Sequence, residues 1–192
     1  MGSGFLKLDD FRRLLDSAPA VALVELSNYG EVFLNPQLLQ IMQCAHQRGV
    51  ALQIGNGANF NNVRDEVIEG LVRYGVRTMT CSIDGASPET YRKYRVRGDF
   101  DAVIRNIEKL NACKSQFRSK LPHLVWQFVV FGHNEHELPA ARAMAARLDM
   151  VFVPKVSWDP DFSPIRDSYF VRAQTGANYV TRQEYEAQRG ER

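Results

Sequence analysis

Hydrophobic residues along the chain follow two alternating spacings, which predict alternating helices and strands. A spacing of three to four residues gathers apolar side chains on one face around Phe11, Met42 and Ile107, as in an amphipathic helix. Short apolar runs separate these segments and predict strands over 21–26, 50–54, 76–83, 124–131 and 150–156. This alternation favours β/α units with a parallel sheet, and the unbroken apolar strands indicate that both sheet faces are covered.

Capping residues indicate where the predicted helices begin. Asp9 or Asp10 is expected to cap the first helix, and Ser87, followed by proline and glutamate, is expected to cap a short one. Asn134, with Glu137 three residues later, resembles a capping arrangement for another helix. On this basis the predicted helices begin near residues 9, 36, 61, 87, 100 and 134.

Five predicted strands are too few to close an eight-stranded barrel. We therefore expect an α/β fold, a partial (β/α) barrel-like parallel sheet of about five strands with flanking helices; a doubly wound open sheet is the alternative. The pattern changes after Trp158, where Asp159-Pro160-Asp161 interrupts regular structure. We expect one domain over 5–157 and a linker or tail over 158–192, in which Thr181 and Glu184 start one last helix.

Candidate chemistry lies where the predicted strands end, because ligands of parallel β/α folds bind at the carboxyl ends of the strands. Three successive strand ends carry glycine beside a polar or acidic group. Glycine lets the backbone approach a ligand closely, whereas carboxylates hold ammonium or ribose hydroxyl groups. The residues concerned are Gly30, Glu31, Asn56, Gly57, Ser82 and Asp84. Ordinary turn chemistry is the alternative reading of each motif.

Two guanidinium groups, those of Arg95 and Arg97, and two imidazole groups follow the later strands. The guanidinium of Arg95 has the planar geometry to hold a carboxylate, or else belongs to a solvated helix end. His133 and His136 lie three residues apart but do not form the H-E-x-x-H zinc motif, so helix-capping and surface roles are favoured over a metal.

Composition and charge narrow the function classes. A net charge of +2 is too small to indicate nucleic-acid or anionic-membrane binding. No apolar run approaches the roughly 20 residues of a membrane span, and the N-terminus lacks a secretory signal pattern. The three cysteines Cys44, Cys81 and Cys113 are widely spaced, which argues against disulfides and against a site built from cysteine alone. We expect a cytoplasmic protein.

The strand-end motifs resemble those of radical S-adenosylmethionine (SAM) enzymes, and more narrowly the branch with a C-terminal SPASM extension. Residues 26–36 resemble the family's G-G-E-P segment and the helix start after it, with Tyr29 and Val32 as departures. Asn56-Gly57 is similar to its T-N-G turn, with Gly55 in place of threonine. The similarity extends over roughly residues 5–155. It includes the segments 81–91, 95–101 and 129–135, and 163–186 resembles the linker to a SPASM domain.

The resemblance implies reductive cleavage of SAM by a [4Fe–4S] cluster, which yields a 5′-deoxyadenosyl radical. It implies that Gly30 and Glu31 face the methionine amino group, and that Ser82, Asp84 and Arg95 face the ribose or carboxylate. Asn56 and Gly57 complete the implied SAM site. The substrate, a small molecule or a peptide, stays open.

The sequence departs from the family at the cluster motif. Relatives bind the cluster through C-x3-C-x2-C on a loop that would precede Ser3, and this sequence contains no such motif. We therefore expect an inactive core fragment with no cluster and weakened SAM binding. Alternatives are a cluster-less SAM- or nucleoside-binding or partner-interaction module, and an unrelated β/α enzyme. The strand at Val21 would leave an unpaired edge open to association.

Overall fold

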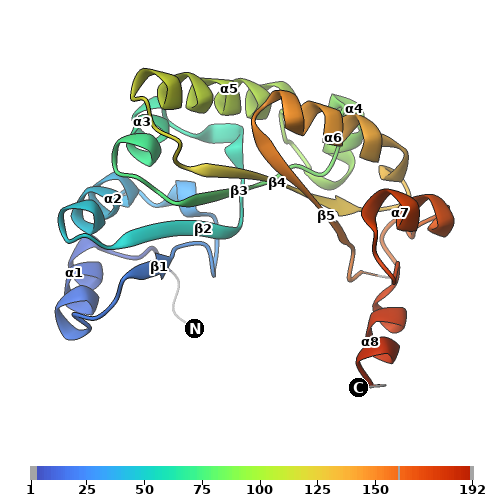
Figure 1. Ribbon diagram of the computed structural model, residues 1–192, viewed down its shortest axis with the longest axis horizontal. Helices are drawn as coiled ribbons and strands as arrows, with labels where there is room; N and C mark the ends of the chain where they lie inside the picture. Colours follow the sequence, from blue (N-terminus) through green and yellow to red (C-terminus); the bar gives the residue numbers. More distant parts are fainter. Residues whose placement is uncertain (1–3, 160, 191–192) are drawn as a thin grey trace. The chain divides into compact units, whose positions relative to one another are not determined.

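The computed structural model describes residues 4–159 and 161–190; Ser3 and Pro160, which two expectations name, lie outside them. Five strands form one sheet in the order β1-β2-β3-β4-β5 (Figure 1). β1 pairs with β2 in parallel, as does β2 with β3. The strands are β1 (Leu23–Glu25), β2 (Ala51–Ala58), β3 (Thr78–Ser82), β4 (His123–Val130) and β5 (Met150–Val156).

Helices separate the strands along the chain, which confirms the predicted parallel α/β sheet with flanking helices. The α-helices are α1 (Leu8–Ser17), α2 (Leu38–Gln47), α3 (Asp65–Arg73), α4 (Pro88–Tyr94), α5 (Phe100–Gln116), α6 (Leu138–Arg147), α7 (Ser168–Thr175) and α8 (Arg182–Gly190). Short 3-10 turns, η1 (Val32–Leu34), η2 (Phe60–Asn62) and η3 (Glu135–Glu137), lie after β1, β2 and β4. Within the described residues, no helix is long and apolar enough to cross a membrane.

Several predicted helix starts are wrong by a few residues because other hydrogen bonds compete for the capping side chains. Lys7, not Asp9 or Asp10, occupies the N-cap of α1, so both aspartates lie in the first turn, where the helix dipole still favours them. Asn134 caps nothing; its side chain bonds the backbone of Phe131 and Val129 instead. The cap at Ser87 is confirmed, since its hydroxyl accepts from the Thr90 N–H.

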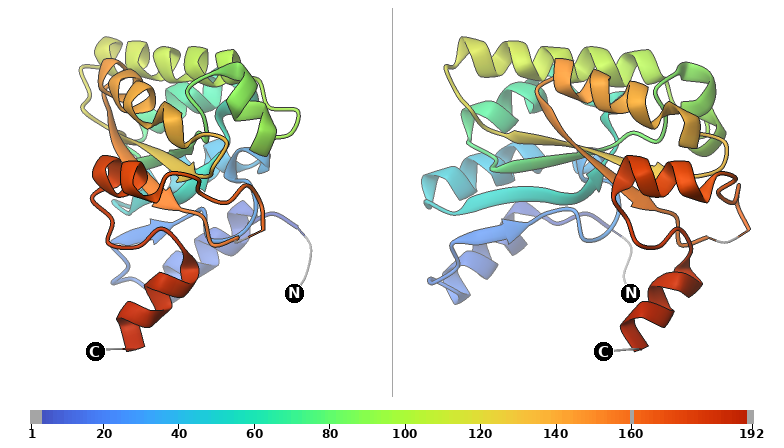
Figure 2. Two further views of the ribbon diagram at one scale, coloured as in Figure 1. Left: turned by 90° about the vertical axis from the view of Figure 1, so that its right-hand side faces the viewer. Right: turned by 45° about the vertical axis from the view of Figure 1, so that its right-hand side comes forward.

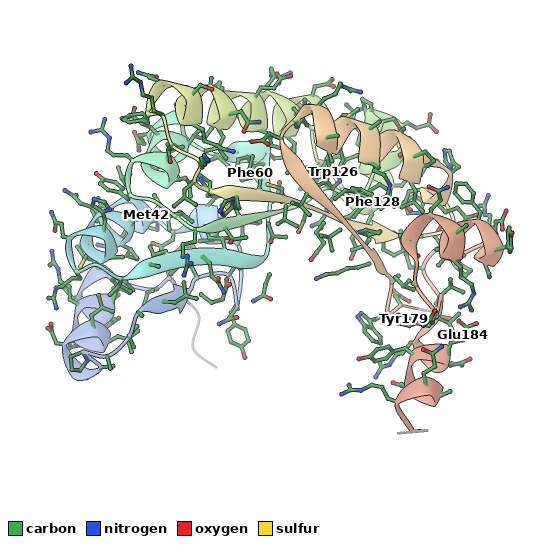
Figure 3. The ribbon with its side chains drawn as sticks, in the orientation of Figure 1. Met42, Phe60, Trp126, Phe128, Tyr179 and Glu184 are labelled. Atoms are coloured by element: carbon green, nitrogen blue, oxygen red, sulfur yellow. The ribbon has the colours of Figure 1, made fainter. Side chains whose placement is uncertain are left out.

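The chain folds into two compact units, which are described separately. The first contains the described residues up to Cys81 together with Asp101–Val125. Its helix α2 packs against α1, α3 and β2. The core is apolar and fully buried, with Met42 and Phe60 among its largest side chains (Figure 3). Each such side chain contributes about 1.5–3 kcal/mol by leaving water.

The second unit contains Ser82–Phe100 and the chain from Trp126 onward. Trp126 is fully buried in β4, and its indole N–H donates to the Ile83 carbonyl at 2.8 Å, so this polar atom is satisfied. Phe128 of the same strand is also buried and packs against Phe152 of β5 (Figure 3). Two short helices, α7 and α8, complete this unit (Figure 2).

β2 is longer than the sequence pattern predicts. Asn56 and Gly57, expected in a turn after the strand, lie inside it. The pairing with β3 moves from Ile54–Met79 to Ala58–Cys81, so β2 advances four residues while β3 advances two. The two extra residues bulge out of the ladder, and Gly57 takes a φ of +103°, which only glycine adopts readily.

Candidate functional site

The carboxyl ends of β1 and β2 are joined by the carboxylate of Glu25. It accepts hydrogen bonds from the backbone N–H of Ser27 at 2.8 Å, from the Ser27 hydroxyl at 2.5 Å, and from the Gly55 N–H at 2.9 Å. A Cβ at position 55 would lie 2.8 Å from a Glu25 oxygen, so a side chain here would displace the carboxylate. Glu25 thus fixes the loop after β1 against the bulge of β2.

Further hydrogen bonds extend this network to the predicted site residues. The Ser27 hydroxyl accepts from the Asn56 N–H at 2.9 Å, and the Asn56 amide donates to the Asn28 side chain at 2.8 Å. Glu31 accepts from the Phe33 N–H at 3.3 Å and from the Asn59 N–H at 2.9 Å. We call Glu25, Ser27, Asn28, Glu31 and Asn56 the strand-end network.

The glycines of this region leave backbone exposed beside the strand-end network. Gly30 has a φ of +72°, and no atom lies within 4 Å of the position a Cβ would take. Glycine is therefore favoured here by the positive φ and not by a lack of space for a side chain. Asn28, Gly30 and Asn56 are exposed, whereas Gly57 is half-buried. The sequence-predicted residues Gly30, Glu31, Asn56 and Gly57 thus all lie in the first unit, where Gly30 and Asn56 are exposed and Glu31 and Gly57 are half-buried.

In the second unit, Asp84 and Arg95 form an ion pair. Asp84 is fully buried, and its Oδ2 accepts from Arg95 Nε at 2.7 Å, while its Oδ1 accepts from the Val129 N–H at 2.7 Å. Arg95 follows α4, and 27% of its side chain is exposed. Because Nε of Arg95 donates to the buried aspartate, the carboxylate orients the guanidinium.

Burial and hydrogen bonding shift the pKa of the Asp84 carboxyl in opposite directions. Burial raises the pKa of the Asp84 carboxyl above its ordinary value, while the Arg95 charge and the Val129 N–H act to lower it. Ser82, at the end of β3, is 9% exposed. The predicted residues Ser82, Asp84 and Arg95 therefore lie in the second unit, and the structure joins Asp84 and Arg95 directly.

The loop after β4 holds a distant segment of the second unit. Buried Glu135 accepts from the backbone N–H groups of Arg166 and Asp167 at 3.0 and 3.1 Å. Ser163 Oγ lies 2.9 Å from His133 Nδ1 and accepts from the His133 N–H. Burial lowers the pKa of the His133 imidazole. These contacts join the loop after β4 to residues 163–167.

The cysteines do not fit a metal or iron–sulfur cluster. Cys44 and Cys81 are buried, and burial raises the pKa of the Cys81 thiol, which opposes the thiolate that a cluster needs. Cys113 is half-buried on α5. Among the described residues, no three His, Cys, Asp or Glu side chains are grouped to hold a metal. No step of chemistry is assigned to a cluster on these residues.

Sequence reasoning missed two carboxylates that organise these regions. Glu25 is the one charged residue of the apolar run 21–26, and a charge inside a predicted strand is the signal that could have identified it. Glu135 lies in the segment read as a helix cap, and its partners at 166–167 are too distant in sequence to be predicted.

Comparison with known proteins identifies the family. Residues 4–143 match the model of the radical SAM superfamily. The AdoMet-dependent heme synthase of Methanosarcina barkeri is 25% identical over 118 residues, which cover 60% of this chain and 33% of that protein.

Solved structures of SuiB from Streptococcus suis share the fold. SuiB bound to S-adenosylmethionine has a TM-score of 0.66 at 13% identity, over 98% of this chain and 43% of SuiB. SuiB bound to the precursor peptide SuiA has a TM-score of 0.66 at 13% identity, over 99% of this chain and 42% of SuiB. The chain thus spans about a third of the curated relative and about two fifths of SuiB. The family match extends over most of the chain, and on this evidence the chain belongs to the radical SAM superfamily.

Proposed function

We propose that this chain supplies the SAM-binding β/α core of a radical SAM enzyme. The observation that carries the proposal is the strand-end network, in which exposed glycine backbone lies beside fixed polar groups at the carboxyl ends of β1 and β2. Fixed groups bind a ligand without paying to order themselves first. The superfamily match supports the identity of the ligand.

The predicted residues of the first unit have these roles in the proposal. The carboxylate of Glu31, held by two backbone N–H groups, faces the ammonium of the methionyl part. Gly30, Asn56 and Gly57 present backbone and amide groups to the ligand.

SAM and adenosine titrations of the full chain by calorimetry test this assignment. Glu31→Gln should weaken SAM at least about 5-fold, since it removes a charge-assisted contact, and leave adenosine unchanged because adenosine lacks the amino-acid part. Glu89→Gln, whose side chain is 85% exposed, is the matched control. SAM binding weaker than about 1 mM, or equal losses for both ligands, would contradict the proposal.

In the superfamily, a [4Fe–4S] cluster supplies the electron that cleaves SAM. The cysteines of this chain do not fit that cluster, so we propose that the chain by itself is inactive. Anaerobic reconstitution with iron and sulfide should leave less than one cluster per chain, measured as bound iron and thiolate–iron absorbance. Stoichiometric cluster together with SAM cleavage would show that this part of the proposal is wrong.

We further propose that the enzyme belongs to the SPASM-type branch, acts on a peptide and works in the cytoplasm. The segment 163–186, which resembles a SPASM linker, supports the branch. The likeness to SuiB, one structure of which holds a precursor peptide, supports the substrate class. A longer form of the protein that modifies no peptide while modifying a small molecule would refute the peptide assignment.

The alternative is a cluster-less module that binds SAM, a nucleoside or a partner protein, and the position of β1 favours the partner role. β1 is the terminal strand of the sheet order, and Leu23 within it is 42% exposed. An unpaired strand edge is a template for association. Self-association measured by sedimentation should decrease in Leu23→Lys; a wild-type chain that stays monomeric at all concentrations would argue against this role.

A further inference from the structure

A cavity of about 330 Å³ lies in the second unit, at the carboxyl end of β5. Its lining comes from the end of that strand and the following residues, from the end of α7 and from the start of α8. This volume is at the lower end of the range for small-molecule sites. We call it the Trp158 pocket, with Lys155, Ser157, Trp158, Thr175, Tyr179 and Arg182 among its lining residues.

Two aromatic side chains, those of Trp158 and Tyr179, line the Trp158 pocket, and a third packs against both. Tyr185 of α8 packs edge-on against Trp158, with ring centroids 4.9 Å apart. The ring centroids of Tyr185 and Tyr179 are also 4.9 Å apart. Trp158 nevertheless stays 53% exposed, and Tyr179 lies beside the start of α8 (Figure 3). An exposed indole held in place by a neighbour offers a ready surface for a planar ring.

Positive charge lies beside these rings. Lys155 and Arg182 line the Trp158 pocket, and none of its described lining residues is Asp or Glu. Arg182 is partly neutralised by Glu186, whose carboxylate accepts from its Nε at 2.7 Å, while its guanidinium carbon lies 5.9 Å from the Trp158 ring centre. Across the described residues, no ion pair neutralises Lys155.

We propose that the Trp158 pocket binds a planar aromatic group that carries a carboxylate. The ring stacks on Trp158 and Tyr179, and the carboxylate pairs with Lys155, with Arg182 adding to the positive field. The inference goes beyond the proposed function, and its test contains no SAM, so the failure of either leaves the other standing.

Three probes separate the contributions of ring and charge. Phenylacetate carries both, phenylacetamide keeps the ring without the charge, and acetate keeps the charge without the ring. Each is titrated by calorimetry into the full chain at low salt. We expect phenylacetate to bind at least about 10-fold more tightly than either of the other two, because it alone makes both contacts. Raising the salt concentration should weaken it.

Lys155→Ala tests the charge contact, and Lys120→Ala, which removes an exposed lysine outside the pocket, is the matched control. Lys155→Ala should weaken phenylacetate at least about 5-fold and leave phenylacetamide unchanged, whereas Lys120→Ala should change neither. Trp158→Phe, which keeps a ring in place, should retain binding, and Trp158→Ala should lose it. Equal affinity for phenylacetate and phenylacetamide, or binding that survives Lys155→Ala, would overturn the proposal.

Discussion

Replacement of Arg95 by methionine tests the electrostatic account of the second unit most directly. The change keeps an apolar stem but removes the charge that faces Asp84, whose side chain is fully buried. Removing one partner of a buried ion pair leaves an uncompensated charge and costs about 3–5 kcal/mol. Because 27% of the Arg95 side chain is exposed, water reaches the vacated site, and we expect a loss near 3 kcal/mol, the low end of that range.

The companion variant Asp84→Asn should cost less. The amide oxygen of asparagine still accepts from the Val129 N–H, so the main loss is one charge-assisted hydrogen bond, about 1.5–3 kcal/mol. In the double variant the ion pair is lost only once. The double variant should therefore lose roughly 1–2 kcal/mol less stability than the sum of the losses in the two single variants.

The direction in which the stability deficit of Arg95→Met changes with pH is an independent test of this account. Burial already raises the folded-state pKa of Asp84, and loss of Arg95, which lowers that pKa, raises it further. A folded state that binds more protons than the unfolded state gains relative stability as pH falls through this window. The Arg95→Met deficit should therefore shrink between pH 7.5 and pH 5.

Urea unfolding at both pH values measures these quantities, with Arg92→Met on the exposed face of α4 as the matched control. The control should change the unfolding midpoint little. Strict additivity of the two single variants, or an Arg95→Met deficit that grows on acidification, would refute the account of a buried, charge-dependent pair.

Three further predictions follow from the contacts described above. In Gly132→Ala, the new Cβ would lie 2.0 Å from the Pro164 carbonyl oxygen. The free energy of unfolding should therefore fall by about 1–3 kcal/mol, which a lower melting temperature would show. An unchanged melting temperature would show that the loop adjusts without cost. Burial lowers the pKa of His133, so the unfolded state binds the extra proton, and stability should fall as pH drops below about 6.5. His133→Gln should flatten that dependence in urea midpoints between pH 5 and 8, and an identical slope would contradict it. Glu25→Gln places an amide donor against the Gly55 N–H and should speed hydrogen exchange at Gly55 about 5-fold or more; unaltered exchange would show that Glu25 does not hold the strand ends.

Family membership resolves one of the open alternatives. Because the chain belongs to the radical SAM superfamily, its fold is not that of an unrelated β/α enzyme. The activity and the substrate of the whole protein stay proposals, since the chain spans only part of its relatives.

The sequence alone was sufficient to predict the alternation of helices and strands and the parallel sheet. Apolar periodicity is a local property, so the alternation of helices and strands was visible without coordinates, and the parallel sheet followed from it. Glycine at a positive φ is likewise a local signal, and Gly30 is an example.

Only the tertiary structure decided which polar groups are already satisfied. Nothing in the sequence shows that Glu25 holds Gly55, 30 residues away, or that Asp84 accepts from Val129, 45 residues away. Such bonds depend on which backbone donors the folded chain brings to a carboxylate, and that is a property of packing rather than of spacing. For the same reason Asp84 emerges as the partner that orients Arg95, whereas sequence reasoning had treated both as direct ligands of SAM.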